Sequence, residues 1–142
     1  MRLKPSNLRP HGIDARARIH AHGIAEQWRA AGLAVDEVEY LHTSRDPGGF
    51  VLTARSDASI LSCRCESWLV RASFWRARPL WTITVTVRDG AGAAEPGVAP
   101  PARSAGIVAD WEYERAWERV GDWIDGTGSL AVTLEDALAE LD

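Results

Sequence analysis

The chain has 142 residues, of which 46% are hydrophobic and 25% charged, and its formal net charge is −4. This composition is that of a soluble globular protein, and it excludes a disordered, collagen-like, coiled-coil or disulfide-stabilised chain. A chain of this length suits one ordinary domain that buries roughly two thirds of its unfolded surface. We therefore expect a single domain over residues 1–142.

Cysteine usage and hydropathy predict a cytoplasmic protein that binds no membrane. Cys63 and Cys65 are too few for a disulfide framework and fit a reducing compartment. No apolar run reaches the roughly 18 residues of a membrane span, and residues 1–12 lack the apolar core of a secretory signal. The excess of arginine over lysine, 15 to one, together with 22 alanines is typical of a GC-rich bacterial genome.

Charge is distributed unevenly along the chain. Residues 1–25 hold five basic side chains and one acidic one, whereas residues 110–142 hold ten acidic and two basic side chains. Such asymmetry can orient a partner or favour head-to-tail self-association. Two ordinary solvated faces would produce the same pattern.

The first half of the chain predicts an arm, a helix and three strands. Residues 1–12, with two prolines and a glycine, predict an irregular N-terminal arm. Apolar residues at helical spacing over 13–31, followed by Gly32, predict an amphipathic helix with a glycine stop. Alternation and turn residues then predict strands over 35–43, 50–55 and 59–65.

The second half predicts two further strand segments, a loop and two helices. Residues 66–77 fit a helical stripe and a strand alternation equally, and we favour a strand continuing the third one because a meander then needs no crossover. Residues 80–88 alternate strictly and predict the clearest strand. Residues 90–106 are rich in Gly, Ala and Pro and predict a flexible loop. Residues 110–124, with Asp110 as N-cap, and the segment after Thr133 predict two C-terminal helices.

Together these elements predict an α+β fold, with a four-stranded antiparallel meander sheet. The N-terminal helix and the two C-terminal helices are expected to pack on one face of it. That face holds the apolar residues of strand 80–88, and the threonines between them occupy a wetter face. Because the chain has only two Phe and two Tyr, we expect most of its seven tryptophans to pack in the core.

No constellation in the sequence predicts a metal site, a cofactor or a catalytic centre. His20 and His22 would point about 200° apart on a helix, and Cys63 and Cys65 have no second pair of ligands at zinc-site spacing. His20 borders the apolar stripe of helix 13–31, which predicts a half-buried, hydrogen-bonded side chain. The chain lacks a Gly-x-Ser-x-Gly motif and a complete phosphate-binding loop.

Basic and aromatic residues interleave from Arg64 to Arg88, and this stretch is the clearest candidate for binding. Protein interfaces are enriched in Trp and Arg, and single-stranded nucleic-acid binders also stack bases on aromatic residues beside Arg. The negative net charge favours a protein partner, and a solvated sheet face above core tryptophans would explain the same residues without one. We predict that the partner-binding residues are Arg64, Arg71, Trp75, Arg76, Arg78 and Trp111.

The sequence therefore predicts a non-enzymatic protein-interaction module. Such a module could be an assembly component of a larger particle, a small chaperone or an immunity-type partner, and it would bind another protein or a second copy of itself. The alternatives are a small enzyme of unknown chemistry and a single-stranded nucleic-acid-binding protein. A pocket lined by two or more titratable groups with shifted pKa values would favour the enzyme.

Overall fold

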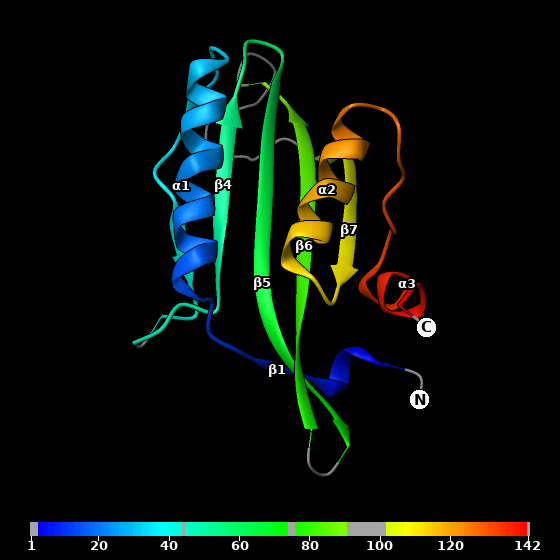
Figure 1. The fold of residues 1–142 in the computed structure, drawn as a ribbon. Helices are drawn as coiled ribbons and strands as arrows, with labels where there is room; N and C mark the ends of the chain where they lie inside the picture. The colour runs from blue at the N-terminus through cyan, green and yellow to red at the C-terminus, as the bar shows by residue number, and fades with distance from the viewer. Residues whose placement is uncertain (1–2, 44, 74–75, 91–101, 142) are drawn as a thin grey trace.

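A computed structural model describes residues 3–43, 45–73, 76–90 and 102–141 of the chain. Over these residues it shows an α+β fold in which three α-helices pack on an antiparallel sheet of seven strands (Figure 1). The helices are α1 (Ala15–Ala30), α2 (Tyr113–Ile124) and α3 (Leu134–Ala139), and a short 3-10 helix, η1 (Pro5–Asn7), precedes them. The strands are β1 (Leu8–Pro10), β2 (Ala34–Val35), β3 (Glu39–Leu41), β4 (Gly49–Arg55), β5 (Ser59–Ser73), β6 (Arg76–Asp89) and β7 (Ala102–Asp110).

The prediction of a four-stranded sheet is wrong: the first predicted strand forms two short strands, β2 and β3, and the sheet also contains β1 and β7, which were not predicted. Strands β4, β5, β6 and β7 follow one another in antiparallel order, while β2 and β3 both pair with β4 and β1 pairs with β5. Strands β2 and β3 lie in the segment 35–43 and just before it, where one strand was expected, and β1 lies in the predicted arm 1–12. Pairings of two or three residues leave no periodic signal in a sequence, so only the folded chain reveals them.

The long hairpin formed by β5 and β6 confirms the preference for strand over helix in the described part of 66–77. Residues 74–75 lie outside the described residues. The predicted loop 90–106 is corrected at its end, because β7 begins at Ala102 and pairs with β6 from there to Asp110; residues 91–101 lie outside the described residues. The Ala- and Gly-rich start of β7 has little strand propensity of its own, and pairing with a long neighbour overrides it.

A side-chain cap begins α1, and the predicted glycine follows its end. The Asp14 carboxylate accepts a hydrogen bond from the Ala17 amide at 2.9 Å and caps the first turn. Gly32 follows the helix with a φ of 93°, a left-handed conformation that glycine adopts without steric cost. In α2 the N-cap is Glu112 and not Asp110, which is the last residue of β7.

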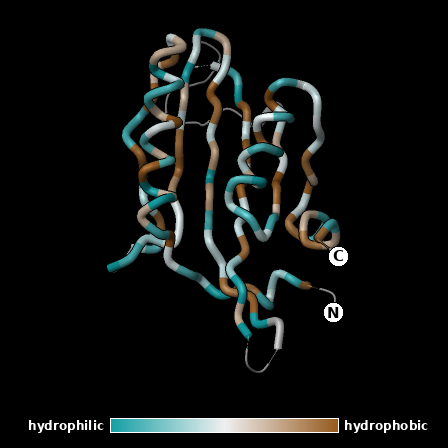
Figure 2. Tube along the Cα trace, viewed as in Figure 1, coloured by the Kyte–Doolittle hydropathy of each residue, from teal (hydrophilic) through white to brown (hydrophobic). Residues whose placement is uncertain are grey.

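Alternation along β5 and β6 divides the apolar side chains between two faces of the sheet, and Figure 2 shows the hydropathy of the residues along the strands. Cys63 and Cys65 of β5 pair with Val85 and Ile83 of β6, and these side chains are buried beneath α1 and α2. In Figure 1, α1 lies over β4, and α2 lies over β6 and β7. This face holds the first hydrophobic cluster, which also includes Trp81 and Phe50.

The second cluster occupies the opposite face and corrects the expected position of the last helix. Leu80 and Ala109 alternate with the first-cluster residues of β6 and β7, and they pack with Ala137 and Leu138 of α3. Helix α3 therefore does not share the face that α1 and α2 cover. Of the six described tryptophans, only Trp81 is a buried core residue, and the other five are partly buried and pack against one of the two clusters, so tryptophan contributes less to the core than expected; Trp75 lies outside the described residues.

The chain passes from one face to the other around the edge of β7. Leu130 packs against the first cluster above Gly106, and the next residue, Ala131, exchanges two backbone hydrogen bonds with Ile107 of β7 at 2.8 and 3.1 Å. A Cβ atom at Gly106 would lie 2.5 Å from the Leu130 Cβ. The absence of a side chain at Gly106 therefore allows this crossing.

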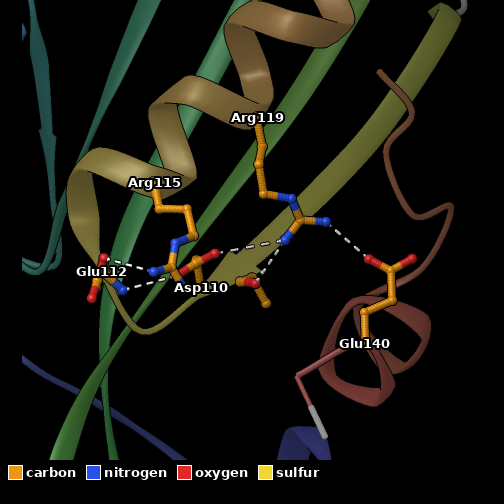
Figure 3. A network of polar contacts seen from close by, with 6 residues as sticks. Asp110, Glu112, Arg115, Arg119 and Glu140 are labelled. Atoms are coloured by element: carbon orange, nitrogen blue, oxygen red, sulfur yellow. Dashed lines mark hydrogen bonds and ion pairs between the residues drawn. The ribbon is translucent and has the colours of Figure 1, made fainter. Parts of the chain in front are cut away.

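A polar network holds α3 to the end of β7 and to α2 (Figure 3). The buried Asp110 carboxylate accepts a hydrogen bond from the Glu112 amide at 3.0 Å. Arg119 of α2 donates to the Ala109 carbonyl at 3.2 Å and to the Glu140 carboxylate at 2.9 Å. Arg115 pairs with Glu112 at 3.1 Å. These contacts join the end of β7, α2 and α3 to one another. The acidic side chains in this network therefore stabilise the fold.

Replacing Gly106 with alanine is expected to destabilise the fold by about 1–3 kcal/mol, because the new methyl group collides with Leu130. Urea unfolding measures the difference. The matched control is Gly23→Ala, since Gly23 lies within α1 and an added Cβ there meets no atom within 4 Å. That control should gain roughly 0.5–1 kcal/mol. Equal unfolding midpoints for the two variants would contradict the close packing of Leu130 on Gly106.

Candidate functional site

Four exposed arginines gather at the end of the β5–β6 hairpin, which extends beyond the helices (Figure 1). Arg71 of β5 pairs with Ala77 of β6, which lies between Arg76 and Arg78. Arg9 of β1 pairs with Leu69, two residues before Arg71. We call Arg9, Arg71, Arg76 and Arg78 the basic end. Among the described residues, none of the four side chains forms an ion pair with a carboxylate.

The basic end presents a different chemistry on each side of the hairpin. Arg9 and Arg71 line a hollow of about 380 Å³ together with Ser6, Asn7 and Leu69. Arg78 pairs with Val70, which is buried in the second cluster, so alternation places the Arg78 side chain on the opposite side from Arg71. Arg71, Arg76 and Arg78, three of the predicted partner-binding residues, thus lie together but do not form one flat patch.

Arg78 and Trp111, both predicted as partner-binding residues, meet in the folded chain. The Arg78 guanidinium carbon lies 4.6 Å from the centroid of the Trp111 ring, within the range of a cation–π contact. Trp111 is half-buried and packs against the second cluster, so its ring holds the exposed arginine in place. A pre-positioned guanidinium loses less side-chain entropy on binding than a free one.

Two other predicted residues do not join the basic end. Arg64 lies six residues before Val70 along β5, about 20 Å away at the rise of a β-strand. Its guanidinium pairs with the Glu66 carboxylate at 2.9 Å, and the same carboxylate contacts the His42 imidazole at 2.9 Å. Arg64 is therefore neutralised locally on the middle of the sheet. Trp75 lies outside the described residues.

Of the two described tryptophans of the basic-aromatic stretch, Trp81 is a core residue and Trp68 is partly buried. Trp81 is 8% exposed in the first cluster. Trp68 packs against the second cluster, and its indole N–H donates a hydrogen bond to the Thr82 hydroxyl at 2.8 Å. Neither ring can serve as a platform on which nucleic-acid bases stack. These two described tryptophans therefore give no support to single-stranded nucleic-acid binding.

A second candidate site lies between α1 and α2, and we call it the interhelical groove. It has a volume of about 500 Å³ and is lined by Arg16, His20, Tyr113, Glu114, Trp117 and Glu118. An adjoining hollow of about 310 Å³ shares three of these residues and continues toward Trp81 and Trp111. The His20 ring contacts the Tyr113 and Trp117 rings edge-on, with centroids 5.2 and 5.8 Å away.

Burial keeps both titratable aromatic groups of the groove neutral. Burial lowers the pKa of His20, and the nearby Glu114 carboxylate opposes this only in part. Burial also raises the pKa of Tyr113. His20 Nδ1 lies 2.7 Å from the Tyr113 hydroxyl oxygen, which confirms the predicted half-buried, hydrogen-bonded histidine. The Trp117 indole N–H is buried near this pair but reaches no partner with hydrogen-bond geometry among the described residues.

Sequence reasoning missed Arg9 at the basic end and the acidic rim of the groove. Arg9 lies in a segment flanked by prolines, and no local pattern shows that this segment pairs with β5. The rim had a detectable signal: Glu114 and Glu118 are four residues apart on one helix, with Trp117 beside them. That spacing predicts a shared helix face, but only the packing of α1 against it makes a groove.

Both cysteines lie in the core of the sheet. Burial raises the pKa of Cys63 to about 12 and that of Cys65 well above its ordinary value, so both thiols stay protonated in the core.

Over the described ranges, no group of three His, Cys, Asp or Glu side chains is placed to hold a metal ion. None of the described helices has the length and apolar character needed to cross a membrane.

Comparison with known proteins found no matching family, no similar curated protein and no similar solved structure. The chemistry of the basic end and of the interhelical groove is therefore argued from their own geometry.

Protonation of His20 is expected to make stability depend on pH. Because the pKa of His20 is lower in the folded protein than its ordinary value of 6.5, the unfolded chain binds this proton first as the pH falls. The contribution of neutral His20 to the free energy of unfolding is therefore complete above pH 6.5 and is lost as the pH falls below 6.5. Urea unfolding from about pH 8 to pH 5 should show a smaller loss of stability for His20→Gln than for the unmodified protein.

The control for this experiment is His11→Gln, which removes an exposed histidine near the start of the chain. It should keep the pH dependence of the unmodified protein. If the stability of His20→Gln and of the unmodified protein depended on pH in the same way, His20 would have the same pKa in the folded and the unfolded chain.

Proposed function

We propose that the protein is a non-enzymatic interaction module that binds an acidic surface of another protein through the basic end. The observation that carries this proposal is the gathering of four exposed arginines, unpaired with any described carboxylate, at the tip of a hairpin that extends beyond the helices. An exposed cluster of like charges is self-repulsive, and an acidic partner relieves this repulsion.

The shape and chemistry of the basic end suit a protein partner. Its arginines reach out from both sides of a two-stranded projection, and polar residues mark its tip in Figure 2. Guanidinium groups form bidentate hydrogen bonds with carboxylates, and Arg and Trp are over-represented among residues that dominate protein interfaces. Arg78 on Trp111 supplies such a pair.

The acidic character of the rest of the chain argues against nucleic acid as the partner. The net charge is −4, and residues 110–142 alone contribute ten acidic side chains against two arginines. Nucleic-acid-binding domains are commonly basic, whereas this chain is acidic overall. The same distribution of charge is compatible with a second copy of the chain as the partner.

One observation favours a small enzyme as the second candidate function. The interhelical groove holds two titratable groups with shifted pKa values, His20 and Tyr113, at hydrogen-bond distance. A neutral imidazole can act as a general base, but the described lining contains no serine, threonine, cysteine or lysine for His20 to activate. The groove therefore supports binding better than it supports catalysis.

Charge reversal at the basic end is expected to abolish partner binding. We would purify the untagged chain from its own host and measure it by native mass spectrometry, which detects any bound protein as added mass. The double variant Arg71→Glu with Arg76→Glu should lose the bound partner or bind it at least roughly tenfold more weakly, because two arginines are replaced by carboxylates that an acidic partner repels.

The matched control is Arg18→Glu with Arg55→Glu, which changes the net charge equally at exposed positions on α1 and β4. It should retain the partner, and far-UV circular dichroism should show both double variants folded. Added mass that persists in the basic-end variant would refute the proposal, as would a bare monomer from the host. Added mass made of nucleic acid and lost at high salt would instead support the nucleic-acid alternative.

A further inference from the structure

We propose that the interhelical groove binds an organic cation, namely an ammonium or guanidinium group carried on an apolar body. This inference is independent of the proposed function, because the groove and the basic end share no residue. Three observations carry it: the aromatic walls, the acidic rim and the arginine that already lies there.

The walls of the groove are aromatic. Trp117 of α2 and His20 of α1 are half-buried and contact each other edge-on, whereas Tyr113 is 4% exposed and its ring contacts those of His20 and Trp81 with centroid distances of 5.2 and 4.7 Å. Aromatic faces attract cations through their quadrupole, and they also cover an apolar ligand body. A volume of about 500 Å³ is within the usual range for small-ligand pockets.

The rim of the groove is negative. Glu114 and Glu118 lie one helical turn apart, and the only cation on the described rim is Arg16. Asp14 adds a carboxylate in the adjoining hollow. Glu118 forms no ion pair with the described residues. The rim therefore attracts cations and repels carboxylates and phosphates.

Arg16 shows that a guanidinium fits against this rim. Its Nη1 atom lies 3.1 Å from a Glu114 carboxylate oxygen, and the two side chains are 71% and 60% exposed. Exposed ion pairs of this kind contribute at most about 1 kcal/mol, so a ligand cation can replace Arg16 at little cost. Arg16 is thus an internal competitor for the site, and its removal should strengthen binding of the ligand.

Benzamidinium and benzamide form a matched pair of probes for this site. Both carry a phenyl ring and a planar head group of nearly the same shape, and only benzamidinium is charged. Binding is followed by NMR through the indole N–H resonance of Trp117, which a Trp117→Phe variant assigns. Benzamidinium should shift this resonance saturably at millimolar concentration, with affinity roughly tenfold above that of benzamide.

Charge variants of the rim provide the test that a non-specific aromatic contact would not pass. Glu118→Gln should weaken benzamidinium several-fold, and Arg16→Gln should strengthen it because Glu114 becomes free. Neither change should affect benzamide. The control is Glu135→Gln, an exposed carboxylate on α3 outside the groove, which should leave the affinity unchanged. All three side chains are exposed, and urea unfolding confirms that each variant folds.

The source of the cation is distinguished with a capped dipeptide, acetyl-phenylalanyl-arginine amide. Tighter binding of this peptide than of benzamidinium identifies a basic protein segment as the ligand, and weaker binding identifies a small amine or guanidine; the cation site stands in both cases. Equal shifts with benzamidinium and benzamide, or equal benzamidinium affinity in Glu118→Gln and Arg16→Gln, would overturn the proposal.

Discussion

The whole structure depends on one constraint, the alternation of side chains along the paired strands β5 and β6. Because successive residues of a strand point to opposite faces, these two strands supply apolar side chains to both hydrophobic clusters. Trp81 faces α1 and α2, and its neighbour Leu80 faces α3. A shift of one residue in this pairing would exchange the two sets, so the register determines where every helix packs.

Both candidate sites arise from the limits of this packing. Two helices, α1 and α2, cover the first cluster. Because they lie side by side, their side chains leave a gap between them, and this gap is the interhelical groove. The β5–β6 hairpin extends beyond the helices, so no helix covers its last residues. Several of these uncovered positions are exposed arginines. Neither site lies on a flexible loop. Each rests on strands or helices held by the core, which gives its side chains defined positions.

The composition of the basic end could be predicted from the sequence, but its extent could not. Arg71, Arg76 and Arg78 were identified because they interleave with aromatic residues, and the pairing of β5 with β6 brings them together. Arg64 belongs to the same pattern but lies far along the strand beside Glu66. Arg9 joins the group only through the pairing of β1 with β5. Distances between strands depend on register and length, which local periodicity does not contain.

By itself, the sequence determined the class of fold, the two longer helices, the glycine that follows α1, the strands of the central hairpin and the packing of the tryptophans against the core. These features follow from local chemistry, since periodicity, turn residues and caps act over a few neighbouring positions. The tertiary structure alone decided that β7 forms from an Ala- and Gly-rich segment, that α3 lies on the second face, and that His20 meets Tyr113. Each of these is a contact between segments far apart in the chain, where the burial of apolar surface outweighs local propensity.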